Sequence, residues 1–163
     1  IDEDNGNTSD VRIDLNLTTD TLGQGVVNST ELDSTGQVVG EETEELVAMK
    51  AEAATFDLNG TSWDVEITEA GQPTQNVVGT VTQTGSNVTI AIAGELIPFV
   101  GRVSGSTYLA MRTVLDSGGV RTDIIWFELT DDSNGTGNSR WYWRDDTDFD
   151  GGAGSLVVTK QVP

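Results

Sequence analysis

Carboxylates and arginines are the residues of this chain that could do chemistry, because histidine and cysteine are both absent. Their absence excludes Ser-His-Asp catalysis, cysteine nucleophiles, zinc sites built on Cys or His, and disulfides. A pair of acids could hydrolyse glycosides, but among 27 acidic residues the sequence nominates no pair. The sequence therefore favours a protein that is not an enzyme, with an enzyme that uses an acid pair as an alternative.

The clearest short motif is the segment 146–151, which reads Asp-Thr-Asp-Phe-Asp-Gly. Alternating carboxylates followed by a glycine turn can wrap oxygens around a hard cation, as in the first half of a calcium loop. Asp146, Asp148 and Asp150 are therefore candidate ligands for Ca²⁺. The twelfth position of such a loop would be Val157, where a bidentate glutamate is required. A solvated hairpin turn is the alternative.

Arginine and aromatic residues alternate in two β-rich segments. In 138–145, arginines and a tyrosine share one face and two tryptophans share the other, whereas 106–115 places a tyrosine and an arginine on one face. Arginine binds carboxylates through its fork of N–H groups, and tyrosine supplies a flat wall. If these faces point inward, they form a pocket for an anionic or aromatic ligand. The candidate ligand-binding residues are Tyr108, Arg112, Arg140, Tyr142 and Arg144.

The opposite orientation is also consistent with this alternation. Trp141 and Trp143 would then lie in the core, because exposing tryptophan costs more than exposing arginine. The arginines would lie outside and pair with acids such as Asp123 or Glu128.

Eight successive β-rich runs must position these residues, and turns rich in glycine, asparagine and aspartate separate the runs. An antiparallel meander of that number closes into a barrel or folds as two stacked sheets. We expect an all-β protein with an eight-stranded antiparallel up-and-down barrel, and a β-sandwich is the alternative. The expected strands are 61–69, 76–83, 86–93, 97–104, 106–115, 120–130, 138–145 and 155–162.

Three regions are expected along the chain. Residues 1–9 have the polar composition of a disordered tether. Residues 10–54 are expected to form strands and one short helix, packed on the barrel of residues 55–163. Val11 to Thr18 alternates apolar and polar residues, as a half-buried strand does. The helix is expected at 41–54, where good helix formers follow a first turn rich in glutamate.

One group of motifs resembles those of known proteins. Leu58-Asn59-Gly60-Thr61-Ser62-Trp63 opens the first strand of the meander, and the stretches 81–89 and 101–105 follow it. Gly60 and Trp63 resemble the Gly-x-Trp of calycins, the lipocalin-like and streptavidin-like barrels, although two residues separate them here. The later stretches are similar to hairpins of bacterial lipocalin-like exported proteins. The resemblance covers about residues 55–163 and implies an up-and-down barrel that holds a ligand in its mouth.

Charge limits the partners. The net charge of −19 repels phosphate backbones and anionic lipids, so nucleic acid is not an expected partner. No apolar run reaches the roughly 18 residues that a membrane-spanning segment needs. The polar residues 2–9 favour an exported protein in the periplasm, at the outer membrane or outside the cell, and they are compatible with a lipid anchor upstream of Ile1.

The sequence leads to two hypotheses for function. The first is a non-catalytic exported protein that binds a small, anionic or aromatic ligand inside the barrel. The alternative is a cell-surface β-sandwich module that binds carbohydrate or a protein partner, with calcium as its one candidate cofactor. A barrel would leave a cavity, whereas a sandwich would be filled, so the interior of the fold distinguishes them.

Overall fold

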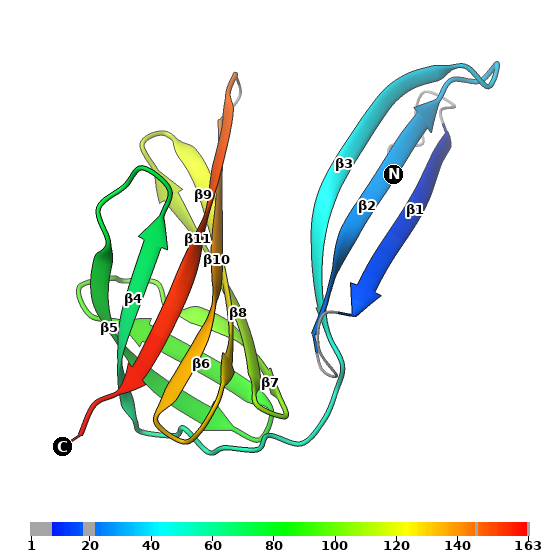
Figure 1. Cartoon of the computed structure of the whole chain (residues 1–163). Helices are drawn as coiled ribbons and strands as arrows, with labels where there is room; N and C mark the ends of the chain where they lie inside the picture. Colours follow the sequence, from blue (N-terminus) through cyan, green and yellow to red (C-terminus); the bar gives the residue numbers. More distant parts are fainter. Residues whose placement is uncertain (1–7, 18–21, 146, 163) are drawn as a thin grey trace. The chain divides into compact units, whose positions relative to one another are not determined.

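The computed structural model describes residues 8–17, 22–145 and 147–162, which form strands and turns and no helix (Figure 1). None of these residues therefore belongs to a helix that could cross a membrane. The chain divides into two compact units, Ile1–Lys50 and Ala51–Pro163. The boundary lies four residues before the one expected from the sequence.

The first unit is a three-stranded antiparallel sheet in the order β1-β2-β3. Strand β1 spans Thr8–Leu17, β2 spans Leu22–Leu32 and β3 spans Val38–Met49. Strand β1 forms where the alternation from Val11 onward predicted a strand, but three of its apolar residues are not buried: Val11 and Ile13 are 60% exposed and Leu15 is 44% exposed. The turn between β2 and β3 is closed by Asp33, whose Oδ1 accepts hydrogen bonds from the backbone N–H groups of Thr35 and Gln37.

The helix expected at 41–54 is wrong. Residues 41–49 belong to β3 and pair with β2 from Glu41 opposite Thr30 to Met49 opposite Leu22. Helix propensity separates these residue types by only a few tenths of a kcal/mol each, so the hydrogen bonds of a continuous ladder outweigh it.

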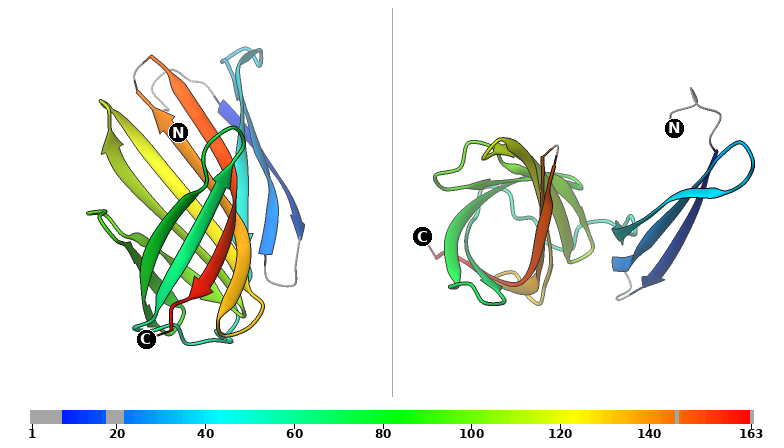
Figure 2. Two further views of the ribbon diagram at one scale, coloured as in Figure 1. Left: turned by 60° about the vertical axis from the view of Figure 1, so that its left-hand side comes forward. Right: turned by 90° about the horizontal axis from the view of Figure 1, so that it is seen from above.

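The second unit is a closed barrel of eight antiparallel strands in the order β10-β11-β4-β5-β6-β7-β8-β9. Each strand pairs with its neighbours in sequence, and β11 pairs with β4 to close the ring, which Figure 2 shows from above. This confirms the eight-stranded up-and-down barrel and excludes the sandwich. The strands are β4 (Ser62–Glu69), β5 (Gln75–Thr84), β6 (Asn87–Ile92), β7 (Phe99–Ser104), β8 (Thr107–Asp116), β9 (Gly119–Leu129), β10 (Asn134–Arg144) and β11 (Phe149–Lys160).

The segment that precedes β4 closes one end of the barrel with backbone and side-chain hydrogen bonds. Buried Gln83 accepts a hydrogen bond at Oε1 from the Leu58 N–H and donates one from Nε2 to the Phe56 carbonyl. The Tyr108 hydroxyl donates to the same Phe56 carbonyl at 3.2 Å. Leu58 itself is 2% exposed and belongs to the core. The segment therefore acts as a plug.

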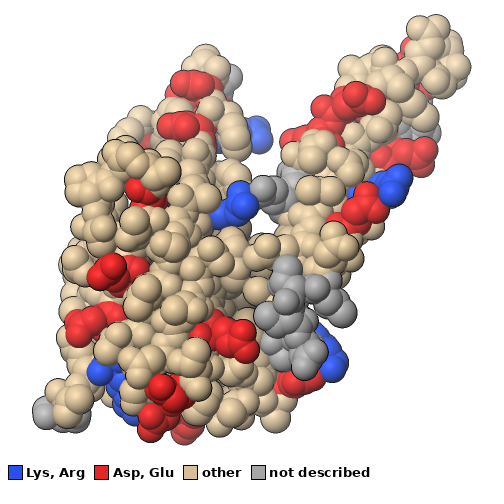
Figure 3. Space-filling view, in the orientation of Figure 1, with Lys and Arg blue, Asp and Glu red and all other residues tan. Residues whose placement is uncertain are grey.

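Inward and outward residues alternate along every barrel strand. The core consists of inward side chains of the barrel unit, including Trp63, Val81, Ile90, Phe127 and Leu156. On the face shown in Figure 3, acidic side chains are spread widely over the surface and basic ones are few, as the net charge of −19 requires.

Candidate functional site

A cavity of about 130 Å³ lies inside the barrel above the plug. Its lower wall is apolar and is built by inward residues of several strands, among them Trp63, Ile90, Phe99, Ile125 and Leu156. The volume is close to that of an engineered cavity of about 150 Å³ that binds benzene. The chamber therefore has room for a ligand with roughly one ring.

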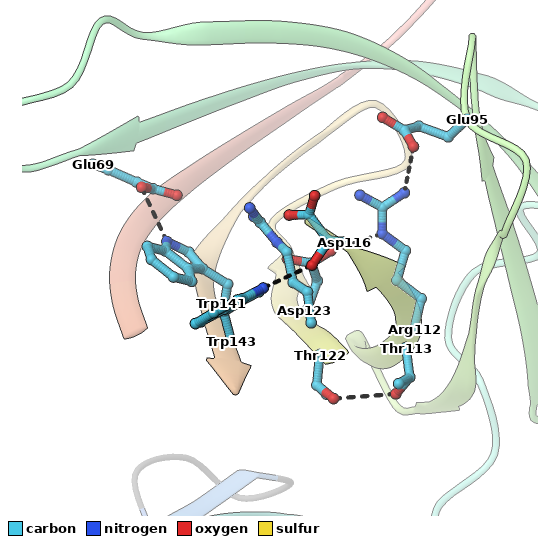
Figure 4. A network of polar contacts seen from close by, with 10 residues as sticks. Glu69, Glu95, Arg112, Thr113, Asp116, Thr122, Asp123, Trp141 and Trp143 are labelled. Carbon is cyan, nitrogen blue, oxygen red and sulfur yellow. Dashed lines mark hydrogen bonds and ion pairs between the residues drawn. The ribbon is translucent and has the colours of Figure 1, made fainter. Parts of the chain in front are cut away.

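A cluster of ionised side chains lines the opposite end, which we call the mouth (Figure 4). At its centre lies Asp123 on β9, whose side chain is 9% exposed. Asp123 Oδ2 accepts a hydrogen bond of 2.9 Å from Arg112 Nε on β8, and Oδ1 accepts one of 2.7 Å from Arg121 Nε. Arg112 Nη1 also lies 3.3 Å from Glu95 Oε2. Two cations thus share one buried carboxylate, and one of them, Arg112, also contacts the half-exposed carboxylate of Glu95.

Trp141 on β10 also lines the cavity, and Trp143 follows it on the same face of the strand. Trp141 Nε1 donates to Glu69 Oε2 at 3.2 Å, and Trp143 Nε1 donates to the Asp116 carbonyl at 2.9 Å. The Arg121 guanidinium lies 5.0 Å from the Trp141 ring centroid, and the Arg112 guanidinium lies 4.8 Å from that of Phe99. Such cation–π contacts fix the long arginine side chains against the wall.

Two buried polar atoms of the cavity wall lack a hydrogen-bond partner. Ser139 is 7% exposed and lines the cavity, and its Oγ is unpaired. Arg112 Nη1 is also buried without a hydrogen bond, because its contact with Glu95 is an ion pair without hydrogen-bond geometry. Buried polar groups are almost always satisfied in proteins. Both atoms are enclosed by neighbouring groups, so a new hydrogen bond to either one requires a neighbour to move.

The ligand-binding residues predicted on β8, Tyr108 and Arg112, both point inward, but only Arg112 lines the cavity. Arg112 lines the cavity, as expected for an inward-facing arginine. Tyr108 also points inward but is fully buried, where it stacks on Phe127 with ring centroids 5.0 Å apart. Burial, with a smaller effect of the Asp57 charge, raises the pKa of the Tyr108 hydroxyl far above its usual range. Tyr108 thus belongs to the closed end and not to the cavity wall.

In strand β10 the tryptophans face inward and the arginines lie on the outer side, which is the second of the two orientations that the sequence allows. Trp141 and Trp143 share the inner face with Ser139, because they pair with the inward residues Asp123 and Arg121. The other three predicted residues alternate with them and lie on the outer side by register, although part of Arg140 borders the cavity. These three are Arg140, Tyr142 and Arg144. The structure therefore separates Tyr142 and Arg144 from the cavity, whereas Arg140 borders the same cavity as Arg112.

The aspartate-rich segment forms a hairpin end. Asp148 Oδ1 accepts a hydrogen bond from the Phe149 N–H, and Asp150 Oδ1 accepts one from the Gly151 N–H. Gly151 lies within β11, so it does not make the sharp turn of a calcium loop. Asp146 lies outside the described residues. Within the described part of the chain, no group of three acidic side chains is arranged to hold a metal ion.

The cavity is also lined by four residues that are not among the ligand-binding residues predicted from the sequence, namely Glu95, Arg121, Asp123 and Ser139. A signal was present for two of them. Arg121 and Asp123 share the odd positions of their strand with Ile125, Phe127 and Leu129, whose apolar side chains mark the inner face.

No protein-family model and no curated protein matches the chain. Among solved structures, it is similar to a protein of unknown function from the DUF3598 family of Nostoc punctiforme PCC 73102. The two are 15% identical, and the match covers 97% of this chain and 72% of that one with a TM-score of 0.39.

Proposed function

We propose that the barrel is a non-catalytic binding module for one small molecule, which sits in the chamber with its polar end toward the mouth. The observation that carries this proposal is a cavity of about 130 Å³ whose lower wall is apolar and whose mouth is lined by ionised side chains. The polar end of a ligand would meet the charged mouth, and its apolar body would cover the lower wall.

Binding is favoured over catalysis by the state of the buried acid. Asp123 is the one charged side chain among the described residues that is less than a tenth exposed. Both of its oxygens accept hydrogen bonds from arginines, so it is occupied in holding the wall together.

The test is native mass spectrometry of the purified protein and of a variant with a blocked chamber. Val77 lines the cavity, and Val77→Trp fills it. Thr82 lies on the same strand but is exposed and points outward, so Thr82→Trp is the matched control. We expect a small molecule that leaves on denaturation, or one that binds from a panel of ring-sized compounds, in the wild type and in T82W. Equal binding by V77W would refute a site inside the chamber.

A further inference from the structure

We propose that Glu95 is a latch at the mouth, and that the ligand is a ring-sized apolar molecule with a single acid group that displaces it. This inference rests on the proposed binding function and names the chemical class of the ligand. It follows from the charges, the exposure and the hydrogen-bond geometry around Arg112.

The charge of the cluster leaves one position for an anion. Arg112 and Arg121 carry two positive charges, and buried Asp123 neutralises one of them through hydrogen bonds to both. The second is balanced by Glu95, which contacts Arg112 alone among the arginines of the described residues. Glu69, whose carboxylate accepts the Trp141 N–H, and Arg140 also line the cavity and carry opposite charges, so the lining as a whole holds three arginines and three acids. A ligand with one carboxylate would restore the same balance if Glu95 moved away.

The Glu95 side chain is held at this position by few contacts with the protein and is about half exposed to solvent. Its side chain is 51% exposed, whereas that of its partner Arg112 is 14% exposed. It belongs to the short connection between β6, which ends at Ile92, and β7, which begins at Phe99. Figure 4 shows it reaching toward Arg112 from this connection. An exposed carboxylate gains little from an ion pair, because water solvates it well when it leaves.

The contact between Glu95 and Arg112 also leaves a donor unsatisfied. Arg112 Nη1 is buried and makes no hydrogen bond, although the Glu95 carboxylate is 3.3 Å away. Once Glu95 has moved away, a ligand carboxylate in its place could accept this N–H in line, and hydrogen bonds between ionised groups are the stronger kind. A ligand acid would therefore gain an interaction that Glu95 does not make.

Other ligand charges fit this site less well. A cation in the place of Glu95 would face the Arg112 guanidinium, and a neutral molecule would leave Glu95 and the unsatisfied Arg112 N–H as they are. The chamber below limits the body of the ligand to about one ring. Phenylacetate is thus a suitable probe, with phenylacetamide and phenethylamine as its neutral and cationic counterparts.

The experiment measures the affinity of the full chain for these three probes by calorimetry. Glu95→Gln removes the charge of the latch and keeps its shape. Glu66 is exposed on the barrel strand β4, so Glu66→Gln removes one charge elsewhere and controls for the net charge of the protein. We expect E95Q to bind phenylacetate about fivefold more tightly than wild type, as the loss of one exposed charge–charge competitor predicts. E66Q should bind it like the wild type.

The possible results separate the latch from the binding function. Equal affinity of E95Q and E66Q for phenylacetate would overturn the latch and leave binding in the chamber intact. Binding of phenylacetamide or phenethylamine as tightly as phenylacetate would overturn the ligand class. If no variant binds any probe and the purified protein carries no small molecule, both the latch and the proposed function are wrong.

Discussion

At the scale of single residues, the wall of the cavity depends on one carboxylate that two arginines share. Asp123 is nearly buried and accepts a hydrogen bond at each oxygen, from Arg112 and from Arg121. A charge in such a place is stable only when it is paired, and its partners depend on it in turn. Asp123 therefore links β8 and β9 at the mouth.

Replacing Asp123 with alanine should destabilise the protein strongly. Arg112 would remain mostly buried next to Glu95 alone, and removing one partner of a buried ion pair costs about 3 kcal/mol. Glu128 lies on the same strand but is exposed, so Glu128→Ala should cost less than about 1 kcal/mol. Urea unfolding of both variants checks this. Equal midpoints would mean that solvent reaches the cluster.

Part of this residue-level detail could be predicted from the sequence. A two-residue turn at Ser117-Gly118, where both residues have positive φ, sets the register that places Arg112 opposite Asp123. That pair could have been predicted from the hairpin. The contact between Trp141 and Glu69 could not, because the two are 72 residues apart and meet only when β11 pairs with β4.

At the scale of elements, the eight barrel strands followed from alternation and turn residues, and the one expected helix did not form. Local patterns identify barrel strands because each buries every second side chain. Residues 41–49 contain four glutamates together with one leucine, one alanine and one methionine, all of them helix formers, and their strand is decided by pairing with β2. Pairing partners are a tertiary property, so local propensity misassigned this segment.

Glycines in the barrel strands show where neighbouring backbones need space, and Gly137 on β10 provides a test. A Cβ at Gly137 would meet the Trp126 carbonyl oxygen and lie 2.6 Å from the Phe127 Cβ. Neither can give way without moving β9, so Gly137→Ala should cost roughly 2–3 kcal/mol as an overpacked site. Its outward neighbour is exposed, and Thr136→Ala should cost under about 0.5 kcal/mol. Thermal unfolding measures both, and equal melting temperatures would contradict the close approach of the strands.

At the scale of the whole molecule, all the residues of the hydrophobic core cluster belong to the barrel unit. The buried members run from Leu58 to Val158, and the partly buried residues packed on them begin at Ala54. The plug that closes the barrel also begins after the unit boundary, with hydrogen bonds from Thr55 to Gly105 and from Leu58 to Gln83. Among the described residues, the hydrophobic core cluster is therefore built from side chains of the barrel unit.

This distribution predicts that residues 51–163 fold without residues 1–50. The fragment keeps the ring of eight strands, the plug and the charged mouth, so it should show one cooperative calorimetric transition and the near-ultraviolet circular dichroism of ordered tryptophans. A fragment that starts at residue 62 is the matched comparison, because it keeps all eight strands and lacks the plug. It should unfold at a lower temperature than the longer fragment, since Gln83 and Tyr108 lose their partners Leu58 and Phe56. A 51–163 fragment without a cooperative transition would show that the barrel needs residues 1–50 to fold.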